Sequence, residues 1–261
     1  MVVILGLGFT GTRVARRLVA RGVEVYAPVR GVERFGELAR AGVHLSELSL
    51  DQPGLVRVPK GAVVAMTIPP LAEPANSQVH DLIRHIAPRR IVYISSTGVY
   101  GDQIDVDSGT PPAPADERGR LRLGEERRIS SGPWSSLILR AAAIYGPGRG
   151  VHASIRQGKL PRGIASGVTS RIHVEDLAAI VEAGIFSDLE GAWPVADDAP
   201  CSTEEIVRWC RDALHVETPG MSESIPTAGR RVDGRAVLGR LNVGLKYPSW
   251  RTGIPASIAE E

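Results

Sequence analysis

Cysteine, lysine and long apolar runs are all scarce in this sequence. Its two cysteines, Cys201 and Cys210, are spaced for neither a CxxC motif nor a zinc site, so we expect two buried or half-buried thiols in a reducing compartment and no bound metal. No apolar run approaches the length that a membrane-spanning helix needs. A strand pattern begins at the first residue and leaves no room for a signal peptide. These absences predict a cytoplasmic protein.

An excess of charge of either sign is also missing. The chain holds 31 basic and 29 acidic residues, a net charge of +2, which argues against nucleic acid or an anionic membrane as a partner. Hydrophobic residues make up 43% of the 261 residues, enough for a sizeable core in one domain with a small second lobe. Lysine occurs only at Lys60, Lys159 and Lys246, so almost all of the positive charge is arginine.

A glycine turn near the N-terminus is the strongest pattern. The apolar run Val2–Leu5 predicts a buried strand, Gly6-x-Gly8-x-x-Gly11 follows, and residues 12–20 place apolar side chains on one face of a helix. In such a unit the first glycine allows a tight turn, the second lets a pyrophosphate approach, and the third lets the helix pack close to the strand. The helix N-terminus adds N–H groups and a positive dipole end. We therefore predict a dinucleotide site with contacts from Gly6, Gly8, Phe9, Thr10 and Gly11.

Strands and helices alternate through the first 150 residues at the interval typical of βαβ units. Strands are predicted at residues 23–29, 61–67, 90–95 and 135–142, which indicates a parallel sheet covered on both faces. The predicted fold class is α/β, a Rossmann-type doubly wound parallel sheet with a small C-terminal substrate lobe. We expect the NAD(P)-binding portion in residues 1–150 and the substrate lobe in residues 151–261, interleaved in one compact unit.

Ligands of such sheets bind at the carboxyl ends of the strands. This rule adds four residues to the predicted cofactor contacts, namely Thr67, Ile68, Pro69 and Ser95. A proline at position 69 also serves to end the strand, so its presence alone does not require a ligand.

Three further segments follow in order behind the glycine turn. They are Ile94-Ser-Ser-Thr-Gly-Val-Tyr-Gly101, Leu139-Arg-Ala-Ala-Ala-Ile-Tyr-Gly-Pro-Gly-Arg149 and Arg171-Ile-His-Val-Glu-Asp-Leu177. With the glycine turn, they resemble the extended short-chain dehydrogenases/reductases, the NAD(P)-dependent epimerase/dehydratase group, over the part of the chain that ends near residue 200. The resemblance implies a Rossmann fold with a seven-stranded sheet and a substrate lobe shorter than in nucleotide-sugar enzymes.

The resemblance breaks at the catalytic pair of that family. Its members carry Tyr-x-x-x-Lys at the start of the helix after a proline-rich loop, where this sequence has Arg118 and Arg122. No tyrosine of the chain precedes a lysine by four residues. An arginine cannot act as a proton-transfer acid, because its guanidinium stays charged at any relevant pH. The chain therefore resembles an atypical member of the family.

Three hydroxyl side chains are the remaining catalytic candidates. Ser96 occupies the family's catalytic Ser/Thr position, where it either hydrogen-bonds a substrate oxygen or satisfies the backbone at a strand end. Tyr100 and Tyr145 lie in loops after strands, where a phenol could donate a proton. Both tyrosines also belong to the general family pattern, which favours a structural role.

The polar helix predicted at residues 117–130 is interpreted as solvated. Its arginines, together with Glu125 and Glu126, form the expected solvent face, and binding of an anionic substrate by Arg118 or Arg122 is the less favoured alternative. His173 is expected to be a packed histidine rather than a base. Glu175 or Asp176 is expected to cap the helix that follows it.

The end of the strand at residues 23–29 predicts the cofactor. NAD-specific folds place a carboxylate at this strand tip, where it binds the ribose hydroxyls and repels a 2′-phosphate. Here the strand is followed by Arg30, about nineteen residues past Gly11, and no carboxylate stands at its tip. Arg30, with Arg34 one helical turn on, favours NADP(H) over NAD(H), although NAD remains an alternative and an exposed turn arginine is the plainer interpretation.

Together these features predict an NADP(H)-dependent oxidoreductase that acts on a small carbonyl-like substrate. Hydride transfer needs an oriented cofactor and a polarising donor, which Ser96, Thr97 or a tyrosine could supply. A sugar-nucleotide-type epimerase or dehydratase would need the missing base, and a catalytically silent dinucleotide sensor is the alternative outside enzymes. Members of the family often pair through the helices at residues 76–87 and 117–130, so a homodimer is the oligomer to expect.

Overall fold

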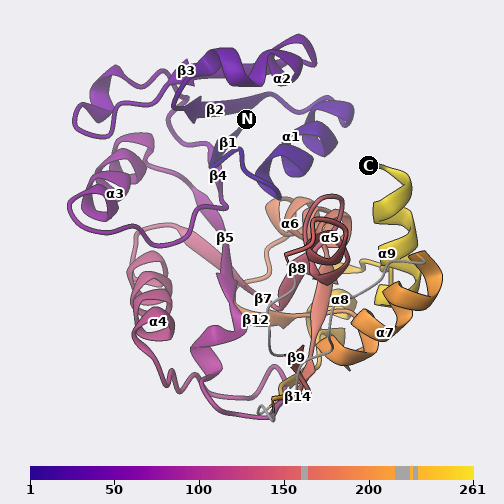
Figure 1. The fold of residues 1–261 in the computed structure, drawn as a ribbon. Coiled ribbons are helices and arrows are strands. Elements are labelled where there is room, and N and C mark those ends of the chain that lie inside the picture. The colour runs from indigo at the N-terminus through magenta and orange to yellow at the C-terminus, as the bar shows by residue number, and fades with distance from the viewer. Residues whose placement is uncertain (160–163, 215–223, 226–228) are drawn as a thin grey trace.

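A seven-stranded parallel sheet runs through the centre of the computed structural model, which describes residues 1–159, 164–214, 224–225 and 229–261 (Figure 1). The strand order is β12-β7-β5-β4-β1-β2-β3, and each neighbouring pair is parallel. The strands are β1 (Val2–Leu5), β2 (Val25–Val29), β3 (Val43–Glu47), β4 (Val63–Met66), β5 (Arg90–Ser96), β7 (Ser135–Ala141) and β12 (Gly191–Val195). The predicted Rossmann-type sheet is therefore confirmed, with the seven strands that the resemblance implied.

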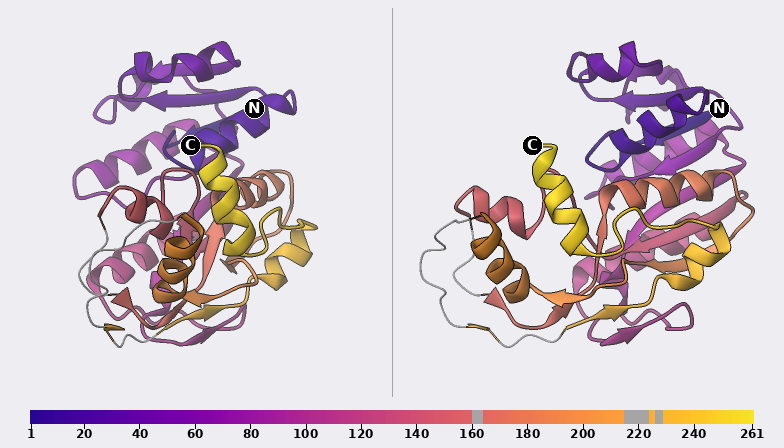
Figure 2. Two further views of the ribbon diagram at one scale, coloured as in Figure 1. Left: turned by 45° about the vertical axis from the view of Figure 1, so that its right-hand side comes forward. Right: turned by 90° about the vertical axis from the view of Figure 1, so that its right-hand side faces the viewer.

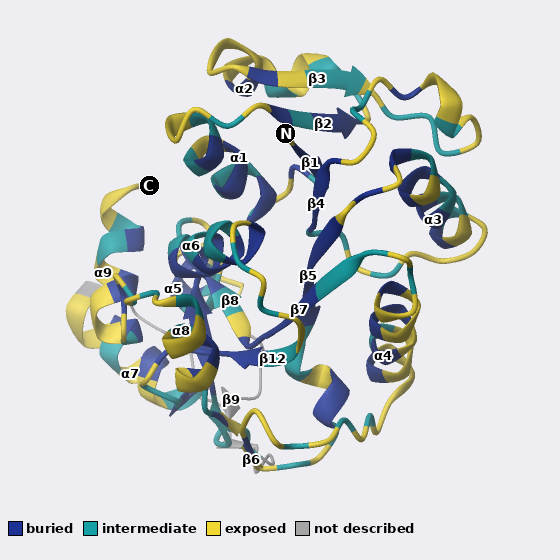
Figure 3. Ribbon diagram, turned by 180° about the vertical axis from the view of Figure 1, so that it is seen from behind, coloured by how far each residue is buried: buried dark blue, intermediate teal, exposed yellow. Residues whose placement is uncertain are grey.

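Helices cover both faces of the sheet, because successive residues of a strand point to opposite sides. Val2 and Ile4 of β1 face one hydrophobic cluster, whereas Val3 and Leu5 face the other. Figure 3 shows the central strands buried between the two helical layers. The first layer is α1 (Gly11–Ala20), α2 (Gly36–Arg40), α6 (Val174–Ile185) and α8 (Arg235–Leu241), and the second is α3 (Ala75–Ile86) and α4 (Glu117–Ser130).

The winding of the chain reverses between β1 and β4. From β1 the chain passes to β2 and β3 on one side, and it then returns to β4 on the other side of β1. Crossovers to the two sides separate at the carboxyl ends of β1 and β4, which leaves a crevice there. The glycine turn follows β1 and therefore lies at this crevice.

A smaller lobe is built mostly from residues beyond β7. Its helices are α5 (Val151–Arg156), α7 (Thr203–Leu214) and α9 (Trp250–Ala259), whose buried side chains form a cluster with both cysteines. Both thiols are free and buried, as expected. Figures 1 and 2 show these helices gathered away from the sheet edge formed by β2 and β3.

Short strand pairs connect the lobe with the sheet. They are β6 (Asp105–Val106) with β15 (Arg231–Val232), β8 (Ala143–Tyr145) with β11 (Arg171–His173), β9 (Ile164–Ala165) with β14 (Ser224–Ile225), and β10 (Val168–Thr169) with β13 (Cys201–Ser202). Residues beyond 150 also supply β12, α6 and α8 to the main sheet and its cover. Among the described residues, three short 3₁₀ helices complete the elements, η1 (Val32–Phe35), η2 (Pro53–Leu55) and η3 (Thr97–Tyr100). Within the described ranges, no helix is both long and apolar enough to cross a membrane.

Candidate functional site

The turn after β1 is held so tightly that two of its positions require glycine. Gly6 has a left-handed φ of 108°, which other residues rarely adopt. A Cβ on Gly11 would lie 1.9 Å from the Gly6 carbonyl oxygen. The Thr67 hydroxyl, just after β4, donates a hydrogen bond of 2.6 Å to the same oxygen. These contacts fix the turn against the end of β4.

Gly8, by contrast, is not required by any contact with the described residues. A Cβ built on it meets no atom within 4 Å, and its φ lies outside the left-handed region. Gly8 lines a cavity instead. The helix that begins beside it, α1, has no acidic residue in its first turn, so its positive dipole end faces no carboxylate of its own there. An open glycine at such a helix start suits a bound pyrophosphate.

The cavity has a volume of about 910 Å³ and runs along the strand ends from the glycine turn to α4. Seven of the predicted site residues line it, namely Gly8, Phe9, Thr10, Thr67, Pro69, Ser95 and Ser96. The others do not, namely Gly6, Gly11, Arg30, Arg34, Ile68, Tyr100 and Tyr145. The structure thus brings most of the predicted dinucleotide contacts together with one of the three catalytic candidates.

Ser96 ends β5 and lines the cavity. Its hydroxyl accepts a hydrogen bond of 3.1 Å from the Gly98 N–H and so caps η3. A hydroxyl that accepts in this way still has its own proton to donate. Ser96 therefore satisfies the backbone at the strand end and keeps a donor for a ligand in the cavity.

The two tyrosine candidates are buried away from the cavity. Tyr100 is 1% exposed, and its hydroxyl accepts a hydrogen bond of 3.2 Å from Arg140. Burial raises the pKa of Tyr100 above its ordinary value. The Tyr145 hydroxyl is also buried and has no hydrogen-bond partner among the described residues. Burial, reinforced by the nearby Asp197, strongly raises the pKa of Tyr145.

Two glutamates of α4 are buried, which corrects the expectation of a fully solvated helix face. Glu126 accepts hydrogen bonds from the Ser95 hydroxyl at 2.6 Å and from the Arg140 guanidinium at 2.7 Å. Glu125 lies 2.8 Å from the ring of His80 and accepts a hydrogen bond from Asn76. The expectation was wrong because these two carboxylates turn toward the sheet and α3, where partners neutralise them.

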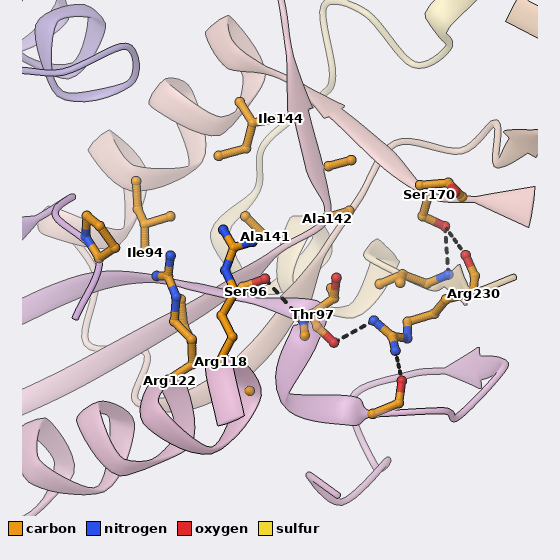
Figure 4. A pocket seen from close by; sticks show the side chains of 18 of the residues that line it. Ile94, Ser96, Thr97, Arg118, Arg122, Ala141, Ala142, Ile144, Ser170 and Arg230 are labelled. Carbon is orange, nitrogen blue, oxygen red and sulfur yellow. Dashed lines mark hydrogen bonds between the residues drawn. The ribbon is translucent and has the colours of Figure 1, made fainter. Parts of the chain in front are cut away.

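The arginines that α4 presents to the cavity have different surroundings. Arg118 and Arg122 line the cavity, and Figure 4 shows their side chains rising side by side toward the end of β5. Neither forms an ion pair with an acid in the part of the chain that the structure describes. Arg122 also lies near the buried phenol of Tyr93. Burial raises the pKa of this phenol to about 12, and the Arg122 guanidinium opposes the rise.

Arg230 forms part of the opposite wall, although it is not among the site residues predicted from the sequence. Its guanidinium donates to the Thr97 carbonyl at 2.7 Å, to the Gln103 carbonyl at 3.1 Å and to the Gly101 carbonyl (Figure 4). These bonds hold the loop after η3 in place. No pattern around Arg230 marks it, because its partners lie far away in the sequence.

His173 is itself the cap of α6, so the predicted caps were wrong. Its Nδ1 accepts from the Glu175 N–H at 3.2 Å, while Asp176 accepts from the backbone N–H groups of Lys246 and Tyr247. The expectation of a packed histidine is confirmed, since His173 is fully buried. Burial, reinforced by the Arg13 charge, lowers the pKa of His173 to about 4.

No protein-family model matches the sequence. Protein YeeZ of Escherichia coli K12 is 27% identical over 267 residues, which cover 95% of this chain and 96% of YeeZ. A 3-diazoavenalumate denitrifying reductase from Streptomyces sp. is 29% identical over 172 residues, which cover 57% of this chain and 55% of that protein. Both relatives are therefore distant in sequence.

Solved structures match nearly the whole chain. A conserved protein of unknown function from Silicibacter pomeroyi has a TM-score of 0.83 and 26% identity, covering 99% of this chain and 98% of its own. The UDP-glucose 4-epimerase of Thermus thermophilus, in complex with NAD, has a TM-score of 0.79 and 19% identity, with the same coverage of 99% and 98%. A putative NAD-dependent epimerase/dehydratase from Methylobacillus flagellatus has a TM-score of 0.78 and 24% identity over 99% and 97%. The fold is that of the NAD-dependent epimerases and dehydratases.

Dinucleotide-binding Rossmann folds recognise the adenosine ribose at the tip of the second strand, a position that the end of β2 occupies here. Arg30 and Arg34 are exposed there, and neither is ion-paired to an acid within the described ranges. The β2–β3 register places Glu47 opposite Val29, and the Glu47 carboxylate accepts from the Gly31 N–H at 3.3 Å. No pattern at the end of β2 points to this carboxylate, because the neighbouring strand β3 supplies it.

Proposed function

We propose that this protein binds a nicotinamide dinucleotide in the cavity and is an NADP(H)-dependent oxidoreductase of a small carbonyl-like substrate. One observation carries the proposal: a single cavity links the open Gly8 of the glycine turn with the Ser96 hydroxyl. A dinucleotide laid along the strand ends would have its pyrophosphate at the first position and its nicotinamide near the second. The epimerase structure with bound NAD supports this placement at the level of the fold.

The residues of the chain divide between holding the cofactor and orienting the substrate. Gly8, Phe9 and Thr10 would hold the pyrophosphate at the start of α1, and Thr67 and Pro69 would border the ribose and nicotinamide. When bound, the cofactor supplies or accepts the hydride.

The Ser96 hydroxyl would donate to the substrate oxygen on which charge develops. Its Gly98 bond fixes the hydroxyl oxygen at the end of β5. The substrate oxygen must also gain a proton. Because Tyr100 and Tyr145 lie outside the cavity, we assign the donation of this proton to water or to Ser96 rather than to either phenol.

A catalytically silent dinucleotide sensor is the second candidate. The observation that favours it is the presence of Arg118 and Arg122 on the cavity wall, where the resembling family has a tyrosine and a lysine. An epimerase or dehydratase is disfavoured for the same reason, because a permanently charged guanidinium cannot act as its base.

The test compares two glycine substitutions. Gly8→Val should leave the thermal unfolding midpoint unchanged and weaken NADPH binding at least about tenfold, because its side chain enters open space at the pyrophosphate position. Gly11→Ala is the matched control: its Cβ would meet the Gly6 carbonyl, so it should lower the midpoint. NADPH fluorescence measures the binding. If the wild type bound neither NADPH nor NADH, the proposal would be overturned.

Turnover separates an oxidoreductase from a sensor. Purified protein should oxidise NADPH in a screen of aldehydes, ketones, imines and activated alkenes. Tight NADPH binding without turnover of any class would favour the sensor.

A further inference from the structure

We propose that the substrate carries an oxyanion, a carboxylate or a phosphate, which Arg118 and Arg122 of α4 bind beside Ser96. This inference rests on the proposed function, since it names the substrate class of the same cavity. In Figure 4 the side chains of Arg118 and Arg122 lie side by side and reach toward Ile94, Ser96 and Ala141, which line the same cavity.

Three acids of α4 and its cap are bound elsewhere, and the fourth, Glu117, is exposed and forms no ion pair with Arg118 or Arg122 among the described residues. Asp116 caps α4 by accepting from the Gly119 N–H at 2.6 Å. Glu125 is bound to His80 and Asn76, and Glu126 is bound to Arg140 and Ser95. No described carboxylate therefore neutralises Arg118 or Arg122.

The helix brings these two positive charges close together. Arg118 and Arg122 are one turn apart on the same face, where like charges repel. Arg118 also lies in the first turn of α4, at the positive end of the helix dipole. Two such charges kept together at a cavity wall indicate an anion that comes from outside the chain.

The pyrophosphate of a dinucleotide does not fill this role. It would lie at the glycine turn after β1, whereas α4 packs against β5 and β7. β4 separates β1 from β5 in the sheet, so these strands are about 10 Å apart. A ribose 2′-phosphate would lie still further away, at the tip of β2. The remaining anion is on the substrate.

Guanidinium groups suit this task because their planar pairs of N–H donors match the oxygens of a carboxylate or a phosphate. Held in this way, the anion would place the adjoining carbonyl carbon close to Ser96. The substrate class is thus a small carbonyl compound with an acidic group near the reacting carbon.

Calorimetric titration of the NADPH-saturated protein with benzoate, phenyl phosphate and benzamide tests the inference. At least one of the two anions should bind at least tenfold more tightly than neutral benzamide. The anion that binds more tightly shows whether the substrate carries a carboxylate or a phosphate. Arg118→Gln and Arg122→Gln should each weaken anion binding about tenfold, as expected for loss of a charged hydrogen bond, and leave benzamide unchanged. Arg127→Gln, on the exposed side of the same helix, is the control and should have no effect.

Equal binding of the anions and benzamide would overturn the inference, as would unchanged anion binding in both glutamine variants. The same titration is also done without NADPH. Because the arginines face the cavity in the free protein, the anions can then be tested for binding even if the protein does not bind NADPH, so the two proposals can fail separately. Arg118→Lys keeps the charge without the paired donors and should give intermediate affinity. Thermal unfolding midpoints equal to that of Arg127→Gln confirm that the variants are folded.

Discussion

The helices α1 and α4 each carry several arginines, and the two sets have opposite surroundings. In α1, Arg13 pairs with Glu175 and Arg17 with Glu182, both at 2.7 Å. Both partners belong to α6, so these charges join two helices on the same face of the sheet. In α4, the arginines that face the cavity have no such partner within the described residues, while Glu125 and Glu126 of that helix are buried.

The difference shows that the partners of a charge, rather than its helix position, determine its role. The α1 arginines lie at the rim of a packed interface and neutralise acids across it. Glu126 anchors α4 to the sheet through Ser95 and Arg140, so it does not pair with Arg118 or Arg122 on the cavity side. Four measurements would break or sharpen this comparison.

The largest effect should come from Glu126→Ala. This change removes the buried partner of Arg140 and leaves its charge uncompensated, which typically costs about 3–5 kcal/mol of unfolding free energy. Glu182→Ala, which breaks the half-exposed pair with Arg17, should cost only about 0–1 kcal/mol. Urea unfolding of both variants measures the contrast. Equal losses would show that the α4 anchor is no stronger than the rim pair.

Ser96→Ala should slow turnover more than any change that leaves the cavity intact. Removing one donor to a developing charge costs about 2–4 kcal/mol, a loss of kcat on the order of 10²–10³-fold. Tyr100→Phe, which removes a hydroxyl outside the cavity, should change kcat less than about tenfold. Steady-state kinetics with a substrate from the NADPH screen compares the two, and a larger loss in Tyr100→Phe would reassign the proton donor.

His173→Asn should change how stability depends on pH. The native pKa of about 4 lies below the ordinary 6.5, so the unfolded state binds the extra proton and wild-type stability falls as pH falls through this window. Asparagine can still cap α6 but does not titrate. Between pH 8 and pH 5 the variant should therefore gain about 2 kcal/mol relative to the wild type.

Denaturant unfolding at the two pH values measures this gain. Burial also raises the pKa of Asp197 to about 7. Asp197 titrates in both proteins, so its contribution cancels from the difference in unfolding free energy between the variant and the wild type. If the difference in unfolding free energy between the variant and the wild type were the same at pH 8 and pH 5, His173 would not be held neutral by its burial and by Arg13.

The smallest effect concerns the exposed arginine at the tip of β2. Arg30→Ala should reduce the preference for NADPH over NADH by about tenfold, because it removes a charged hydrogen bond to the 2′-phosphate. Glu47→Gln should raise that preference by removing a nearby negative charge. Parallel titrations with both cofactors measure the ratio. A wild type that prefers NADH would contradict the assignment, and unchanged ratios in both variants would move recognition elsewhere.

Local patterns were enough to predict the sheet and the glycine turn. Val2–Leu5 and the glycines after it belong to one continuous segment, so their spacing carries the structure directly. The same holds for Ser96, which a strand pattern places at a carboxyl end.

The partners of the charged residues could not be predicted in this way. Glu126 of α4 pairs with Arg140 of β7, Glu47 lies at the tip of β2 because of the β2–β3 register, and Arg230 donates to the Thr97 carbonyl from 133 positions further along the chain. Each of these contacts depends on how the elements pack against one another. The spacing of hydrophobic residues within one segment does not show which other segment will lie beside it. Polar α4 was misjudged for the same reason.

The bonds of Arg230 also have a consequence for the order in which the molecule is built. Arg230 and Thr97 are separated by 133 positions, and contacts of such long loops form after local ones. β1, β2, β4 and β5 all lie within the first 96 residues. A chain emerging during synthesis would hold its glycine turn long before the opposite wall closes. A ligand that contacts both walls would therefore be held by both only after Arg230 has joined the site.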